Sequence, residues 1–399
     1  MYGSARAEDA SIHNTKLRKG DVFMNIAKNI VNKYYAQKYY NSGLSHYKKG
    51  QYENALADYT KAIVLDPNYA GYANRGNCYY VLKQYENAIA DYTKVIVLDP
   101  NVANYYGIRG FCYYALKQHE NAIADFTETI ELDPNNTDCY FARGVCYDYL
   151  KQYQNAIADF TKEIDLNPSK IISYYRRSNS YRALGQHKNA IVDCTKAIDL
   201  EPDDPLCYCS RGESYYILKQ YENAIADFTK DIELTEDASA YNNRGTCYYN
   251  LKQYENAIAD YTKAIDLDPE YASAYCNRGI CYCYLKQYEN ALADYNKAIE
   301  FNPKYARAYD NRGNCYYDLE QHENALADYT KAADIRNSLA EQYEKQRADY
   351  EVVVEQYKNA IASYTKVIGL DPNNSDYRDR LRDCSQKLEQ YEKNNAKKE

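Results

Sequence analysis

The chain has 399 residues, with 49 lysines and arginines against 57 aspartates and glutamates, and a formal net charge of −8. This balance offers no basic surface to neutralise phosphates, so it disfavours nucleic-acid binding. A mean hydropathy of −0.78, without any apolar run long enough for a membrane helix, disfavours membrane insertion. The apolar residues include 51 tyrosines and no tryptophan. Because a tyrosine packs its ring and keeps its hydroxyl wet or hydrogen-bonded, the composition favours many half-buried interfaces over one deep core.

The N-terminal residues point to a tail followed by a short helix. The first twenty residues lack the apolar run of a secretory signal, so we expect a cytoplasmic protein, or export by a route that reads no such signal. We expect residues 1–20 to be a disordered tail. An apolar stripe comes after a candidate N-cap at Asp21 and consists of Val22, Phe23, Ile26, Ile30 and Tyr34. It predicts an N-terminal capping helix over residues 21–35 that covers the segment beginning at residue 36.

From residue 36 onward the sequence repeats. The segment LKQYENAIADYT occurs at residues 82–93 and again at 251–262. One alanine of this segment recurs every 33 to 35 residues, at Ala55, Ala88, Ala122, Ala156, Ala190, Ala224, Ala257, Ala291, Ala325 and Ala360. The spacing predicts nine regular repeats over residues 36–339 and a degenerate tenth over 340–373, which we number one to ten.

Each repeat reads as a helical hairpin. Apolar residues recur at helical spacing in two blocks, which a short Leu-Lys-Gln connection separates. Eight of the nine prolines come after the second block, at Pro67, Pro100, Pro134, Pro168, Pro202, Pro269, Pro303 and Pro372. Since proline lacks the N–H that would continue a helix, each one resets the chain for the next hairpin.

The pattern resembles the tetratricopeptide repeat (TPR), a family whose unit is a helix-turn-helix with aromatic, small and proline residues at fixed offsets. In repeat seven the matching residues are Tyr241, Gly245, Tyr248, Ala257, Tyr261, Ala264 and Pro269. The resemblance implies an all-α, right-handed superhelical solenoid of antiparallel hairpins with capping helices at both ends. Glycine at the helix crossing lets the two helices approach closely.

Departures from the pattern mark the places where the repeats change. Glu163 and Asp231 replace a small apolar residue, so their helices must tilt or pair the charges. In repeat ten, Glu344, Ala348 and Glu351 replace tyrosine, glycine and tyrosine. We expect this degenerate repeat and a helix over residues 374–393 to cap the stack, followed by a frayed tail over 394–399.

Catalysis, metals and cofactors find no support in the sequence. His119, His187 and His322 each replace a tyrosine of the repeat, and six of the thirteen cysteines occupy one small-residue slot. The thirteen cysteines include no C-x-x-C pair, so reduced thiols are expected. Aspartate and lysine recur three residues apart, and we expect weak ion pairs on a solvated face for Asp58 with Lys61, Asp91 with Lys94, Asp159 with Lys162 and Asp260 with Lys263. We predict no enzyme activity, no cofactor and no metal site.

The candidate site is the concave groove that the resemblance implies for the first helices, at the second, fifth, ninth, twelfth and thirteenth positions of each repeat. The second helices are nearly identical, whereas the groove positions vary. The predicted peptide-binding residues are Tyr47, Tyr80, Tyr114, Tyr216, Tyr249, Tyr317, Asn77, Asn179, Asn242, Asn314 and Arg307. The six tyrosines form a ladder that suits an extended peptide or an amphipathic helix. An alternative is that the ladder reflects only the chain's general use of tyrosine.

We therefore predict a noncatalytic scaffold or adaptor that binds a peptide segment or helix of a partner protein. The alternative is a leaderless exported effector that captures a host protein through the same groove. A carboxylate clamp of the co-chaperone type is disfavoured, because Asn74, Asn243, Asn277 and Asn311 match only its middle element. Binding of RNA is disfavoured as well, since the groove positions carry more acidic than basic residues.

Overall fold

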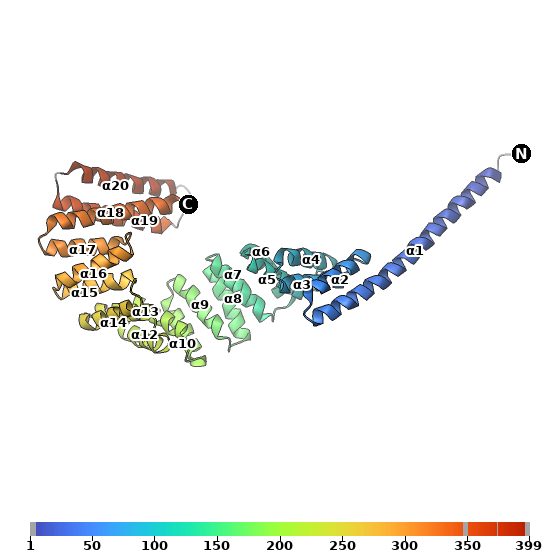
Figure 1. Ribbon diagram of the computed structural model, residues 1–399, viewed down its shortest axis with the longest axis horizontal. Helices are drawn as coiled ribbons and strands as arrows, with labels where there is room; N and C mark the ends of the chain where they lie inside the picture. The colour runs from blue at the N-terminus through green and yellow to red at the C-terminus, as the bar shows by residue number, and fades with distance from the viewer. Residues whose placement is uncertain (1–4, 346–349, 373, 396–399) are drawn as a thin grey trace. The chain divides into compact units, whose positions relative to one another are not determined.

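The structure, a computed structural model, describes residues 5–345, 350–372 and 374–395. Over these residues it contains α-helices and no strand (Figure 1). The helices are α1 (Ala5–Lys48), α2 (Tyr52–Leu65), α3 (Tyr69–Val81), α4 (Tyr85–Leu98), α5 (Ala103–Ala115), α6 (His119–Leu132), α7 (Thr137–Tyr149), α8 (Tyr153–Leu166), α9 (Ile171–Ala183), α10 (His187–Leu200), α11 (Pro205–Ile217), α12 (Tyr221–Thr235), α13 (Ala238–Asn250), α14 (Tyr254–Leu267), α15 (Ala272–Tyr284), α16 (Tyr288–Phe301), α17 (Ala306–Asp318), α18 (His322–Lys345), α19 (Tyr350–Leu370) and α20 (Ser375–Asn395). They fall into two compact sections, Met1–Gln186 and His187–Glu399.

Within each section, successive helices form hairpins that stack on one another. Repeats two to four correspond to α3–α8, and repeats six to eight to α11–α16. In the repeats that lie wholly inside one section, the first helix packs on the second helix of its own repeat, and within a section each second helix packs on the next first helix (Figure 1). The predicted all-α hairpin architecture is confirmed.

A left-handed residue ends each first helix and makes the hairpin turn tight. In repeat two this residue is Lys83, with φ of 58°. The next residue, Gln84, donates its N–H to the carbonyl of Tyr79 at 2.8 Å, as in a Schellman helix end. Gly50 and Gly185 hold the equivalent places in repeats one and five. The Leu-Lys-Gln connection is therefore the helix stop that the sequence predicted.

In eight of the nine regular repeats, a glycine of the first helix lies against the buried ring of the second helix, and Ser178 takes its place in repeat five. A Cβ atom added at Gly279 would be 2.7 Å from Cε1 of Tyr295, which is closer than real Cβ contacts. The ring of Tyr295 is only 1% exposed, so it has no room to move. The expected close approach at the glycine positions is confirmed.

The predicted aspartate–lysine pairs are wrong for most repeats. Only Asp58 and Lys61 come within 4.0 Å of each other. The aspartate is instead buried and accepts two hydrogen bonds from an arginine of the first helix, sixteen residues earlier. These pairs, at 2.7–2.8 Å, are Arg75–Asp91, Arg109–Asp125, Arg143–Asp159, Arg211–Asp227, Arg244–Asp260, Arg278–Asp294 and Arg312–Asp328.

Each of these arginines also ties its repeat to the one before. Arg278 donates to the hydroxyl of Thr262 in repeat seven at 3.0 Å and lies over the ring of Tyr275 at 5.6 Å. Burial raises the pKa of Asp294 even though Arg278 pulls it down, which shows how far the pair is removed from water. The buried aspartates thus hold the first and second helices of a repeat together.

The N-terminal helix is longer than predicted. Residues 21–35 are helical, but they are continuous with the first helix of repeat one in α1. Backbone from residue 5 onward belongs to the same helix, and residues 1–4 lie outside the described residues. The disordered tail expected over residues 1–20 stays a prediction. The stripe does not cover repeat one, because Phe23, Ile30 and Tyr34 are 73%, 64% and 68% exposed. Nothing in the sequence between residues 21 and 48 stops a helix, since this stretch has no proline and only Gly43.

The C-terminal end is also built from long helices. α18 has 24 residues, against 14 for α16, because it continues into the predicted first helix of repeat ten. Here Arg336-Asn337 replaces the Asp-Pro that comes after α14. The missing proline is not sufficient by itself, since α12 also lacks one and still ends at Thr235, where Glu236 is left-handed. In α18 the apolar stripe continues through Ala340, which is fully buried.

α18, α19 and α20 lie side by side around one apolar cluster (Figure 1). Its buried members include Val353, Tyr357, Tyr364 and Cys384. The predicted C-terminal helix is present as α20, which runs to Asn395; residues 396–399 lie outside the described residues. The degenerate repeat and the helix after it therefore form a group of three packed helices at the C-terminal end.

Glu163 and Asp231, the two acidic residues that replace a small apolar residue, each have a partner close by. Glu163 is fully buried, and Lys170 lies 3.3 Å from one of its carboxylate oxygens. Asp231 accepts a hydrogen bond from Thr235 at 3.3 Å, and burial raises its pKa. Pairing, the second of the two expected outcomes, thus applies to Glu163, while a neighbouring hydroxyl serves Asp231.

Candidate functional site

The six ladder tyrosines all lie near the end of a first helix and support the hairpin turn. Each ring packs against the first aromatic ring of the next helix. The centroid distances are 5.4 Å for Tyr47–Tyr52, 6.0 Å for Tyr80–Tyr85, 5.9 Å for Tyr114–His119, 5.7 Å for Tyr216–Tyr221, 6.0 Å for Tyr249–Tyr254 and 5.4 Å for Tyr317–His322. Most of the six rings are half-buried, whereas Tyr80 and Tyr317 are 38% and 49% exposed. The ladder is therefore part of the hairpin packing and is also accessible.

The four predicted asparagines already have partners within the protein. Asn77 and Asn314 each accept a hydrogen bond at 2.8 Å from the buried tyrosine of the same repeat, Tyr92 and Tyr329 respectively. Asn179 accepts from Arg182 at 3.2 Å. Asn242 is only 8% exposed and accepts from Asn277 at 3.0 Å. Their carbonyl oxygens therefore position neighbouring side chains before any ligand arrives.

Two adjoining cavities open between the first helices of repeats seven to nine. The larger has a volume of about 400 Å³ and the smaller about 200 Å³. Tyr249, Ile280 and Arg307 line both, and they come from α13, α15 and α17. Three successive first helices thus supply one continuous lining, as expected of groove positions nine, twelve and two.

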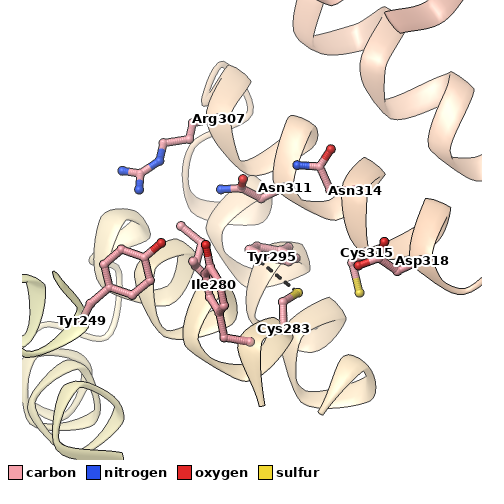
Figure 2. A pocket seen from close by; sticks show the side chains of 10 residues that line it. Tyr249, Ile280, Cys283, Tyr295, Arg307, Asn311, Asn314, Cys315 and Asp318 are labelled. Atoms are coloured by element: carbon pink, nitrogen blue, oxygen red, sulfur yellow. Dashed lines mark hydrogen bonds between the residues drawn. The ribbon is translucent and has the colours of Figure 1, made fainter. Parts of the chain in front are cut away.

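The larger cavity has opposite charges at its ends. Figure 2 shows Arg307 reaching over it toward Tyr249, with Asp318 at the far side and the amide of Asn311 between them. Arg307 is exposed, and no carboxylate of the described residues pairs with its guanidinium. The neighbouring Asp310 is unavailable to it because that carboxylate pairs with Arg336. The cavity therefore presents a cation that has no carboxylate partner among the described residues, beside an aromatic and aliphatic wall.

Aromatic stacking makes that wall rigid. The ring of Tyr284 stacks on Tyr254 at 5.1 Å with an interplanar angle of 10° and meets Tyr249 edge-on at 5.7 Å. Burial raises the pKa of the Tyr249 hydroxyl, with the hydroxyl of Tyr284 as the next cause. A preformed wall of this kind needs little ordering when a ligand binds.

The sequence prediction found part of this lining and missed the rest. Tyr216, Tyr249, Asn314 and Arg307 line the cavities, whereas the buried Asn242 does not. Lining residues that were not predicted include six in the first helices of repeats eight and nine: Ile280, Cys283, Tyr284, Asn277, Asn311 and Asp318. Four of these occupy groove positions nine, twelve or thirteen, so the positional rule points to them even though they are not all tyrosine, asparagine or arginine.

Other chemistry receives no support from the residues that the structure describes. No group of three or more histidine, cysteine, aspartate or glutamate side chains among them could hold a metal ion. The histidines occupy packing positions, such as His119 stacked on Tyr149 at 4.8 Å. In the described part of the chain, no helix combines the length and apolar character needed to span a membrane.

Comparison with known families identifies the repeat. Models of the tetratricopeptide repeat match residues 36–69, 70–102, 103–136, 238–271 and 272–305, residues 126–158, and residues 171–204, 206–237, 306–339 and 354–374. The chain belongs to the tetratricopeptide repeat family. Proteins of this family are in general noncatalytic scaffolds for protein interactions.

Solved structures of TPR proteins are similar to parts of the chain. A crystal structure of MamA is 27% identical, covers 40% of this chain and 94% of its own, and has a TM-score of 0.39. YrrB, described as a TPR protein with an unusual peptide-binding site, is 26% identical over 46% of this chain and 95% of its own, with a TM-score of 0.41. A TPR protein from Parabacteroides merdae ATCC 43184 is 20% identical over 62% of this chain and 98% of its own, with a TM-score of 0.43. No curated protein matches the chain.

Proposed function

We propose that this TPR protein is an adaptor whose groove over repeats six to nine binds an acidic segment of a partner protein. The observation that carries the proposal is the exposed Arg307 at the junction of the two cavities, without a carboxylate partner among the described residues. A guanidinium offers a planar set of N–H donors that fits a carboxylate in bidentate fashion. A glutamate, an aspartate or a C-terminal carboxylate of the partner would fill this place.

The walls of the cavities favour an extended segment with one apolar side chain next to the acidic one. Tyr249 and Ile280 offer apolar surface beside Arg307, and the amides of Asn277 and Asn311 can hydrogen-bond a peptide backbone. Tyrosine contributes contact area at a small entropic cost because its ring has few rotamers. Asp318 at the far side would take a basic side chain of the same segment.

A peptide library displayed on phage and selected on the full-length protein tests the proposal. We expect the selected peptides to be enriched in aspartate or glutamate next to an apolar residue. Arg307→Gln should weaken their binding at least tenfold, which is the loss of one charge-assisted pair. Lys263→Gln is the matched control, because it removes one cation from the second helix of repeat seven and should leave affinity unchanged.

In this experiment no ladder tyrosine is replaced by alanine. Tyr249 packs on Tyr254 and Tyr284, so Tyr249→Ala would loosen the hairpin as well as the groove. Tyr249→Phe keeps the ring and removes only the hydroxyl, and circular dichroism would check the fold of each variant. Selected peptides that bind Arg307→Gln and the wild-type protein equally well would refute the assignment of this groove.

A further inference from the structure

Within a section of the chain, a recurring contact joins neighbouring repeats inside the groove. The side chain at position twelve of one repeat meets the small side chain at position ten of the following repeat. In the first section this contact is a hydrogen bond of 2.5 Å from Ser180 to Asp148, which lie 32 residues apart. Elsewhere a ladder tyrosine faces the recurring cysteine: Tyr249, for example, packs in one cluster with Cys281.

At one place of the described chain, this contact brings two thiols together. Position twelve of repeat eight holds Cys283 in place of a tyrosine, and position ten of repeat nine holds Cys315. They are also 32 residues apart, on α15 and α17, and both line the larger cavity (Figure 2). The substitution of a single ladder tyrosine therefore creates a pair of neighbouring cysteines.

The two thiols differ in exposure and in acidity. Cys283 is partly exposed to the cavity, whereas Cys315 is 1% exposed. The neighbouring Cys315 thiol lowers the pKa of Cys283 to about 7, and the hydroxyl of Tyr295, 3.4 Å from its sulfur, acts in the same direction. The Cys315 thiol itself donates to the backbone carbonyl of Tyr288 at 3.8 Å. The interaction with Cys283, together with burial, raises the pKa of Cys315. Since a thiolate is the reactive form of cysteine, Cys283 is the nucleophile of the pair.

Most other cysteines lack these properties. Cys281, in the equivalent slot one repeat earlier, is fully buried, and burial raises its pKa to about 12. Buried, protonated thiols of this kind are inert. Cys209 is the other partly exposed cysteine, and its sulfur is 3.9 Å from a carboxylate oxygen of Glu213. A nearby carboxylate does not stabilise a thiolate. Cys209 is therefore a partly exposed cysteine of lower expected reactivity, with which Cys283 can be compared in the same protein.

We propose that Cys283 and Cys315 are a redox modification site, at which a peroxide links repeats eight and nine by a disulfide. The Cys283 thiolate attacks one oxygen of hydrogen peroxide, the O–O bond breaks, and the departing hydroxide takes a proton to become water. The Cys315 sulfur then attacks the resulting sulfenic acid while its thiol proton leaves with the sulfenic oxygen as water. Two thiols and one peroxide give one disulfide and two waters, and an external dithiol reverses the step.

Oxidation of the full-length protein tests the proposal. After treatment with hydrogen peroxide, remaining thiols are blocked with N-ethylmaleimide in denaturant and the digest is mapped without reduction. We expect two of the thirteen thiols to be lost and a disulfide to join the peptides that contain Cys283 and Cys315. Cys283→Tyr, which restores the ladder residue, should retain all of its remaining thiols, while Cys281→Ser should behave as wild type.

Two variants of Cys315 separate chemistry from structure. Cys315→Ser keeps an O–H donor in a slot where serine occurs naturally, so Cys283 should react with iodoacetamide at the wild-type rate but form no disulfide. Cys315→Ala removes the polar group beside Cys283 and should slow that alkylation about threefold at pH 7, since thiolate fraction and nucleophilicity partly offset each other. The proposal is overturned if oxidised wild-type protein contains no Cys283–Cys315 disulfide, or if Cys209 reacts with iodoacetamide faster than Cys283.

Discussion

Repeats seven and eight and the C-terminal end show two ways to hold helices together in one section of the chain. In α13–α16, helices of 13 or 14 residues cross at a glycine and are fastened by buried arginine–aspartate pairs. In α18–α20, helices of 24, 21 and 21 residues share one apolar cluster. Their ion pairs, such as Arg380–Asp334 at 3.0 Å, are about 40% exposed on both sides.

The difference shows what the repeat signature does physically. Glycine, the arginine–aspartate pair and the helix stop allow short helices to meet closely at a fixed angle, and they repeat because each hairpin needs the same contact. Where these residues are absent, the helices are longer. Extended apolar faces then take the place of the glycine contact and the buried ion pair. The C-terminal end should therefore depend on apolar burial, and the regular repeats on specific side-chain pairs.

The largest expected effect is the loss of the apolar cluster at the C-terminal end. Val353 of α19 is fully buried in it, whereas its neighbour Val352 is 42% exposed. Val353→Asp should lower the free energy of unfolding of this end by about 5 kcal/mol, because it buries an unpaired charge. Hydrogen exchange of α18–α20 measures the effect locally. Val352→Asp should stay within about 0.5 kcal/mol of wild type, and equal losses in the two variants would contradict the packing described.

A regular repeat should fail instead when its buried pair is broken. Arg278→Gln leaves the 7%-exposed carboxylate of Asp294 without its partner, and we expect a loss of about 3 to 4 kcal/mol. Arg380→Gln at the C-terminal end should cost less than about 1 kcal/mol, because that pair is solvated. Urea unfolding followed by circular dichroism measures both variants. A similar loss of unfolding free energy in the two variants would show that the buried arginines do not hold the helices together.

Introducing or removing a proline should also have different effects in the two regions. Asn337 lies inside α18 at the place where regular repeats end their second helix with proline. Asn337→Pro removes a helix hydrogen bond and should cost about 3 kcal/mol, with a measurable loss of ellipticity at 222 nm. Pro269→Ala, between α14 and α15, should cost less than about 1 kcal/mol. If Asn337→Pro were tolerated as well as Pro269→Ala, the continuous α18 would be wrong.

The sequence predicted the regular repeats well because their contacts are local and periodic. Alanine, glycine and proline at a spacing of about 34 residues fixed the hairpins and most of their boundaries. The prediction paired the aspartates with the nearer lysine and missed their true partner, although an arginine followed by a small residue recurs sixteen residues before them. That pairing depends on the crossing of two helices, which periodicity along one helix does not reveal.

The two ends and the candidate site were harder to predict, for different reasons. α1 and α18 continue through positions where no single residue forbids a helix, so their lengths depend on burial that only the folded chain provides. At the site, the position numbers led to Tyr216, Tyr249, Asn314 and Arg307, which line the two cavities. The position numbers did not predict that Asn242 would be buried, or that Arg307 would remain without an acidic partner in the described chain.

The smallest effect concerns the glycines and has opposite signs in the two regions. Gly279→Ala would place a methyl group 2.7 Å from Cε1 of Tyr295, so helix propensity cannot compensate for the clash and we expect a loss of about 1 to 2 kcal/mol. A methyl group added at Gly369, near the end of α19, would meet no neighbouring atom within 4 Å. Gly369→Ala should therefore stabilise the C-terminal end by about 0.5 kcal/mol through helix propensity alone. Differential hydrogen exchange of α15–α16 and α19 compares the two variants. Because the same chemical change is made in each, a shared sign would mean that glycine is kept in the regular repeats for a reason other than the close approach of the two helices.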